Sequence, residues 1–200
     1  MAKLYFRYGA MGSSKTANAL MVNFNYHERG LKPLLLKPAM ENRDGEKIIK
    51  SRVGLQAECQ FVEDFFFEDY EKTAALIREY DAVIIDEVQF CEIWQIKMMQ
   101  QLVTEVCVPI ICYGLREDFM QEPFAASKEL ASRANVIEEL KTVCWCGDGA
   151  TCNTRLDGEG NVVRAGEQIM LGGNELYTSL CRKHYLQGDI GPKMRAKYGK

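Results

Sequence analysis

The chain lacks both a long apolar run and an excess of positive charge. No stretch of 18 apolar residues occurs, and 25 Lys and Arg stand against 28 Asp and Glu, for a formal net charge of -3. Nucleic acids and anionic membranes are bound by clustered positive charge, so this composition disfavours both as partners. With no membrane-length segment and no charged leader before an apolar stretch, we expect a soluble cytoplasmic protein.

Histidine is also scarce, with two residues, whereas cysteine is not, with eight. Four cysteines stand singly in segments that resemble core strands or helices, and we expect them to be buried thiols. These are Cys59, Cys91, Cys107 and Cys112. The other four crowd into the last third of the chain with His184, and in a reducing compartment such clustering favours a metal over disulfides. These are Cys144, Cys146, Cys152 and Cys181.

A glycine-rich loop near the start of the chain carries the strongest signal. Residues 4–8 are typical of a short buried strand and lead directly into the sequence G-A-M-G-S-S-K-T at 9–16. This nearly matches the phosphate-binding pattern G-x-x-x-x-G-K-[ST], in which backbone N–H groups surround phosphate oxygens. Helical spacing follows, with an apolar face predicted at Ala17, Leu20, Met21 and Phe24. We expect phosphate binding by Gly9, Ala10, Met11, Gly12, Ser13, Ser14, Lys15 and Thr16.

Ser14 departs from that pattern, because it stands where the second glycine belongs. If the loop requires a positive φ there, the Cβ costs about 1–2 kcal/mol. Such strain would weaken nucleotide binding without preventing the fold. The alternative is a Gly/Ser-rich turn that binds nothing, but the strand–turn–helix context favours a phosphate loop.

A second motif follows the apolar run that starts at Tyr80 and ends in Asp86-Glu87. Such a run predicts a strand buried on both faces, with its carboxylate emerging beside the phosphate site. Because consecutive strand residues point to opposite sides, we expect Asp86 to hold Mg²⁺ and Glu87 to face a second substrate as general base. The alternative is a pair of solvated carboxylates that cap the next helix.

Further strands and helices alternate along the chain, which predicts an α/β fold of the P-loop NTPase type: a parallel sheet with helices on both faces. The expected strands are 33–37, 61–67, 109–113 and 135–141, and the expected helices are 69–80 and 92–106. The uneven stretch 39–60 is either functional or mobile. Phe119 and Phe124 lie in a loop on the active side, where they either pack on the core or stack on a base.

Composition changes beyond Thr142, and we expect a nucleotide-binding domain at 1–142 and a small lobe at 143–200. Cys-x-Cys and a distant Cys-x-x-His supply four ligands that suit a closed, structural tetrahedral zinc site. They are Cys144, Cys146, Cys181 and His184. Two alternatives stay open: Cys152 replaces one ligand, or the lobe holds no metal.

Taken together, these motifs resemble the type II, zinc-containing thymidine kinases of bacteria and eukaryotic cytosol. The resemblance covers essentially all 200 residues in order. It rests on the loop at 9–16, D-E-V-Q-F at 86–90, Y-G-L-R-E-D-F at 113–119, G-G-N-E-L-Y at 172–177 and C-R-K-H at 181–184.

The resemblance implies ATP-dependent phosphorylation of the thymidine 5′-hydroxyl, giving dTMP for nucleotide salvage. It implies Glu87 as general base, Mg²⁺ organised by Thr16 and Asp86, and phosphates steadied by Lys15. The nucleotide site would include Asp86, Glu87, Val88 and Gln89. A lasso loop near 170–177 would close over the nucleoside, and the pocket wall would consist of Met11, Phe90, Leu115, Phe119, Phe124 and Tyr177. Family kinship also implies a homotetramer.

Two departures keep rival functions open. The family's D-x-R motif is here Glu41-Asn42-Arg43, and Ser14 replaces a loop glycine. A kinase for another deoxynucleoside is one rival. A nucleotide-binding module without catalysis is the other.

Overall fold

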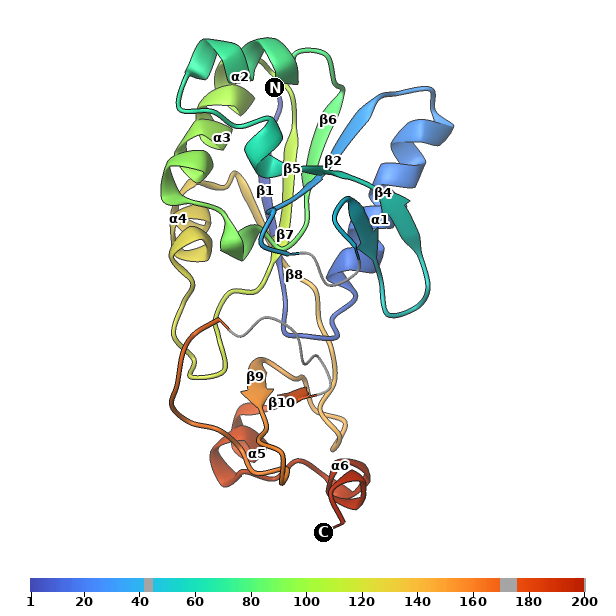
Figure 1. Cartoon of the computed structure of the whole chain (residues 1–200), viewed down its shortest axis with the longest axis vertical. Helices are drawn as coiled ribbons and strands as arrows, with labels where there is room; N and C mark the ends of the chain where they lie inside the picture. Colours follow the sequence, from blue (N-terminus) through green and yellow to red (C-terminus); the bar gives the residue numbers. More distant parts are fainter. Residues whose placement is uncertain (42–44, 170–175, 200) are drawn as a thin grey trace.

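In the computed structural model, which describes residues 1–41, 45–169 and 176–199, the described strands include a six-stranded parallel sheet (Figure 1). Its spatial order is β5-β2-β6-β7-β1-β8. The strands are β1 (Leu4–Tyr8), β2 (Pro33–Lys37), β5 (Gln60–Phe61), β6 (Ala82–Ile85), β7 (Ile110–Gly114) and β8 (Val136–Glu139). Figure 1 shows β1 running from the N-terminus toward a smaller lobe, so the carboxyl ends of the parallel strands face that lobe.

Helices cover both faces of the sheet, because alternate strand residues are apolar on both sides. Leu34 and Leu36 join the core under α2 (Tyr70–Ile77), α3 (Ile93–Glu105) and α4 (Ala125–Arg133). Leu35 joins the opposite core, under α1 (Lys15–Glu28). The predicted α/β fold is confirmed.

Two packing predictions were wrong in part. Ala17 and Leu20 are buried as predicted, but Met21 and Phe24 are 54% and 58% exposed, because the buried side of α1 also includes Ala19 and Asn23 and not these two residues. Lys15 is buried in the first turn of α1, and this orientation of the helix turns Met21 and Phe24 outward. Cys107 is exposed, since it occupies a left-handed position (φ 62°) in the connection between α3 and β7 rather than a strand or helix.

The uneven stretch after β2 contains a hairpin, β3 (Ile48–Lys50) and β4 (Gln56–Glu58), which the sequence did not predict. Lys37 fixes it, because its buried ammonium donates to the carbonyls of Gly45 (2.8 Å) and Ile48 (2.9 Å).

The strand expected at 61–67 is limited to β5, and a 3₁₀ turn, η1 (Val62–Asp64), follows it. A second such turn, η2 (Val88–Phe90), follows β6.

The lobe at the C-terminal end contains β9 (Cys152–Arg155), β10 (Tyr177–Leu180), α5 (Arg182–Gln187) and α6 (Pro192–Lys197). Its apolar core is separate from those of the sheet and includes Cys152, Leu156, Leu180 and Tyr185. A domain boundary at 142/143 stays a prediction. Among the described helices, none is long and apolar enough to cross a membrane.

Candidate active site

A pocket of about 280 Å³ opens between the carboxyl ends of the strands and the lobe. Its lining comes from the glycine-rich loop, the segment after β6, the β3–β4 hairpin, the segment after β7, and the lobe. Most of the predicted site residues meet there: Met11, Gly12, Ser14, Lys15, Thr16, Asp86, Glu87, Gln89, Phe90, Leu115, Phe119, Phe124 and Tyr177. Ligands of parallel sheets bind at this edge, so its location fits a nucleotide site.

The glycine-rich loop turns sharply into α1. Ser14 precedes the helix in the left-handed conformation (φ 61°), so the condition for strain at this serine is met. Gly9, Ala10 and Ser13 do not line the pocket. Gly9 lies beneath the loop, where a Cβ would stand 2.3 Å from the Leu140 carbonyl oxygen, so this turn requires glycine.

Lys15 is buried at the bottom of the pocket. Its ammonium donates to the Gly9 and Ala10 carbonyls, both at 2.9 Å. Burial lowers the pKa of Lys15 to about 8, and the nearby carboxylates of Glu87 and Asp86 oppose that shift. The loop therefore holds a cation beside the N-terminus of α1, where phosphate oxygens are stabilised by both charge and helix dipole.

Asp86 directly follows β6 and is 3% exposed. Burial and the adjacent Glu87 carboxylate raise its pKa, while a hydrogen bond from the Thr16 hydroxyl opposes this. Within the described part of the chain, its Oδ1 is buried without a hydrogen-bond partner. An unpartnered carboxylate oxygen next to a threonine hydroxyl is a donor set that suits Mg²⁺.

Glu87 also lines the pocket, but strand alternation is not the reason. The strand β6 ends at Ile85, and Glu87 reaches the pocket from a left-handed turn (φ 53°). Gln89 holds its carboxylate: Nε2 donates to Glu87 Oε2 at 2.6 Å, and Oε1 accepts from the Leu115 N–H at 3.0 Å. A Cβ on Gly114 would lie 2.6 Å from Gln89 Oε1, so glycine leaves the room for this bridge. Val88 is buried in the core and does not line the pocket.

Aromatic side chains form another part of the wall. Phe90 and Phe124 pack edge to face with ring centroids 6.0 Å apart. Phe119 and Phe124 are 1% and 5% exposed and also line the pocket, so they belong to the core and to the wall at once. The predicted lasso lies outside the described residues except for its end, where Tyr177 accepts a 2.6 Å hydrogen bond from Arg155 Nε.

Several lining residues were not predicted as site residues. They include Lys37, Glu41, Arg52, Asp118, Asn153, Gln168 and Ile169. Glu41 and Asp118 belong to motifs noted in the sequence, at 41–43 and 113–119, whereas the others lie in stretches without a recognisable spacing. Their place at the pocket depends on how the hairpin and the lobe fold over the loop, and local sequence does not reveal that arrangement.

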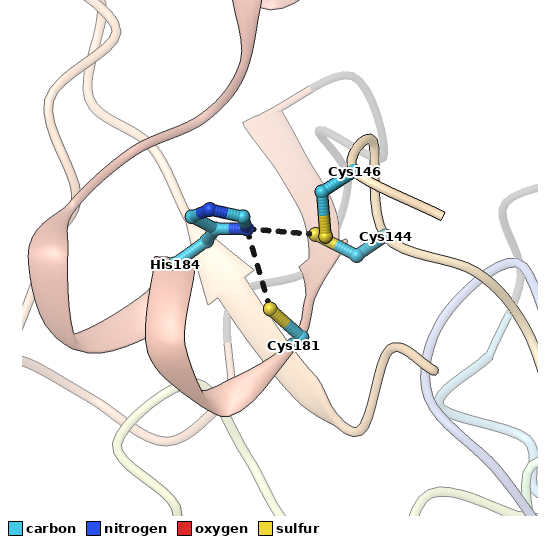
Figure 2. A group of neighbouring side chains, drawn as sticks. All are labelled: Cys144, Cys146, Cys181 and His184. Carbon is cyan, nitrogen blue, oxygen red and sulfur yellow. Dashed lines mark hydrogen bonds between the residues drawn. The ribbon is translucent and has the colours of Figure 1, made fainter. Parts of the chain in front are cut away.

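The predicted metal ligands also meet (Figure 2). One ligand atom from each of Cys144, Cys146, Cys181 and His184 lies within 4.8 Å of the others. His184 Nδ1 is 3.5 Å from Cys144 Sγ and 3.3 Å from Cys181 Sγ. Tetrahedral bonds of about 2.0–2.3 Å separate ligands by roughly 3.3–3.8 Å, so the spacing and the S₃N donor set fit zinc. Cys152 lies outside this group, in the lobe core.

A glycine-rich loop of the phosphate-binding pattern, a buried Asp86 beside a half-buried Glu87, and a partly aromatic pocket at one sheet edge define a P-loop nucleotide-binding protein. The thymidine kinase family model matches residues 2–185, and the chain belongs to the thymidine kinase family, as its sequence predicted. It is 41% identical to the thymidine kinase of Vibrio vulnificus, across 92% of this chain and 97% of that protein. It is 40% identical to that of Coxiella burnetii, across 94% and 97%.

Among solved structures, the Pif1 helicase from Candida albicans is similar to this chain with a TM-score of 0.44 and 14% identity. That match covers 71% of this chain and 36% of the helicase chain.

Proposed function

We propose that this protein transfers the γ-phosphate of ATP to the 5′-hydroxyl of thymidine, giving dTMP and ADP. One observation carries the proposal: Lys15 and Glu87 line the same pocket, which also has an aromatic wall. Phosphoryl transfer needs a positioned triphosphate and a positioned hydroxyl, and such a pocket can hold both. Family membership supports thymidine as the nucleoside.

The phosphates would bind at the start of α1, against the loop amides and Lys15. Thr16 and Asp86 would hold Mg²⁺, which neutralises phosphate charge when it is bound. Glu87 would accept the proton of the 5′-hydroxyl as that oxygen bonds to the γ-phosphorus. The bond from the γ-phosphorus to the β–γ bridging oxygen breaks, and ADP leaves with that electron pair.

The thymidine base and sugar would occupy the other end, against Phe90, Phe119, Phe124 and Tyr177. Because an apolar wall excludes water, it protects the phosphoryl group from hydrolysis and strengthens the charge interactions beside it. Met11 and Leu115 complete this part of the wall.

Zinc in the Cys144–Cys146–Cys181–His184 cluster would be structural, since four protein ligands leave no open position for catalysis. A homotetramer and a cytoplasmic location are further parts of the proposal, and both rest on the family. Native mass spectrometry of the purified protein measures the number of chains in the assembly and so tests the homotetramer.

Replacement of the proposed base tests the reaction. Glu87→Gln keeps the size of the side chain but cannot accept the proton, so we expect kcat for thymidine to fall by about 10²–10⁴-fold. Binding of a fluorescent ATP analogue should be retained. Glu79→Gln, an exposed change near the end of α2, is the control and should keep wild-type activity.

Wild-type turnover by Glu87→Gln would refute the role of Glu87. A panel of deoxynucleosides with labelled ATP tests the substrate. Product from another nucleoside and none from thymidine would refute thymidine as the substrate. Tight Mg·ATP binding with no product from any nucleoside would refute catalysis.

A further inference from the structure

Two lobe residues form hydrogen bonds with the backbone N–H and carbonyl of Met11, in the predicted phosphate loop. The Met11 N–H donates to Asn153 Oδ1 at 2.8 Å, and the Met11 carbonyl accepts from the Ser179 hydroxyl. Asn153 lies on β9 and Ser179 on β10, and the two residues stand directly opposite each other in the β9–β10 pairing. We call these two hydrogen bonds the Met11 clamp.

Burial and a second hydrogen bond hold the Asn153 side chain in this position. It is 3% exposed, and its Nδ2 donates to the Glu117 carbonyl at 2.6 Å. That bond fixes the orientation of the amide, so Oδ1 faces the Met11 N–H. One buried side chain thus ties the lobe both to the phosphate loop and to the segment that carries Phe119. Thr142 adds a weaker bond, from its hydroxyl to the Gly12 carbonyl at 3.3 Å.

Met11 belongs to both proposed ends of the pocket. The peptide groups that follow it, at Gly12 to Lys15, belong to the predicted phosphate-binding turn, whereas Met11 itself lines the pocket as part of the predicted nucleoside wall. Its N–H is already bound to Asn153 and is not free for a phosphate oxygen. The clamp therefore serves to set the direction of the loop.

The nucleoside end of the pocket depends on the same lobe. Tyr177 is the first residue of β10, two positions before Ser179. Arg155 lies on β9, two positions after Asn153, and donates a hydrogen bond to the Tyr177 hydroxyl. Its guanidinium carbon lies 3.8 Å from the centroid of the Phe119 ring. A shift of β9 and β10 on nucleoside binding would therefore move the partners of Met11 as well.

We infer that Asn153 and Ser179 are positioning residues that couple the two substrate ends of the pocket, so that a bound nucleoside strengthens nucleotide binding by the loop. The inference rests on the proposed function. Because coupling between two binding sites is reciprocal, a bound nucleotide must strengthen nucleoside binding by the same factor.

Isothermal titration measures this coupling directly. The dissociation constant of a non-hydrolysable ATP analogue with Mg²⁺ is determined with and without saturating thymidine, and that of thymidine with and without the analogue. In the wild-type protein, we expect each ligand to tighten the other by about 5–150-fold, a typical range for such coupling. In Asn153→Ala and Ser179→Ala, the factor should fall toward one, while each ligand alone still binds.

Conservative and neighbouring variants separate coupling from simple attachment of the lobe. Ser179→Thr keeps the hydroxyl donor and should restore most of the coupling. Thr178→Ala alters the adjacent residue of β10, outside the clamp, and should leave the coupling factor unchanged. In steady-state assays, Asn153→Ala should raise the KM of both substrates more than it lowers kcat.

Two results would overturn the inference. One is a wild-type protein without coupling, and the other is clamp variants that lose thermal stability but keep the wild-type coupling factor. Ser179→Ala removes only one hydroxyl and supplies the measurement if Asn153→Ala fails to fold. Because titration needs no turnover, failure of the proposed function is seen separately, as a wild-type protein that makes no dTMP.

Discussion

Ser14 and Glu87, neither of them glycine, hold left-handed backbone conformations at the edge of the pocket, with φ values of 61° and 53°. A Cβ makes that conformation unfavourable by about 1–2 kcal/mol per residue. Strain of this kind gathers at functional sites, where the surrounding structure enforces a direction for a side chain or a loop. At Glu87, the turn brings the carboxylate into the pocket, where Gln89 donates to it.

Ser14→Gly should stabilise the protein. Removal of the Cβ releases about 1–2 kcal/mol of strain, while glycine adds about 0.4–1 kcal/mol of unfolded-chain entropy. The net gain is about 0–1.6 kcal/mol, and each 1 kcal/mol raises Tm by roughly 2–4 °C for a chain of this length. Differential scanning fluorimetry measures it. Ser14→Ala keeps the Cβ and should show no gain, so a glycine variant that melts no higher than the alanine variant would contradict strain at this position.

At the scale of elements, the sequence predicted those whose pattern is local. The strands β2 and β6 consist largely of apolar residues because both faces are buried, and the motif directly after β6 located the carboxylates of Asp86 and Glu87. The exposure of Met21 and Phe24 was not predicted, since the rotation of α1 depends on how the loop places Lys15. Asn153 gave no signal, because its role exists only when β9 folds against the phosphate loop.

The β3–β4 hairpin was not predicted for a related reason. Its strands have only three residues each, and it is held in place by hydrogen bonds from Lys37, a residue of β2. This hairpin brings a cation to the pocket. Arg52 lies in its turn and makes no hydrogen bond or ion pair with the residues that the structure describes. Its Nη1 is 4.0 Å from the point where a Cβ on Gly12 would stand. On the proposed function, that guanidinium lies near the phosphate end.

Arg52→Ala should slow phosphoryl transfer, because charge develops on the transferred group and a nearby guanidinium stabilises it. We expect kcat to fall by about 10²-fold, as for the loss of one electrostatic donor, with little change in the KM for thymidine. Arg78→Ala removes an exposed arginine at the end of α2 and is the control. A normal kcat in the Arg52 variant would mean that the hairpin contributes no charge to the reaction.

At the scale of the whole molecule, the lobe and the sheet depend on each other. Among the lobe residues that the structure describes, few large apolar side chains belong to the core, and two core members are the predicted zinc ligands Cys144 and Cys181. So small a core provides little folding energy, and in such lobes metal binding supplies much of it. Because the lobe carries Asn153, Ser179 and Tyr177, its folding affects both the glycine-rich loop and the proposed nucleoside wall.

Loss of the metal should therefore abolish activity from a distance. We expect about one zinc per chain by metal analysis, and we expect Cys181→Ser to lose that zinc and more than about 10²-fold of thymidine phosphorylation. Circular dichroism should retain the helices of the sheet domain, since those helices pack on cores that exclude the lobe. Cys107→Ser, at an exposed thiol outside the cluster, should keep both zinc and activity. A Cys181 variant that is free of metal and fully active would show that the lobe holds Met11 and Tyr177 without help from zinc.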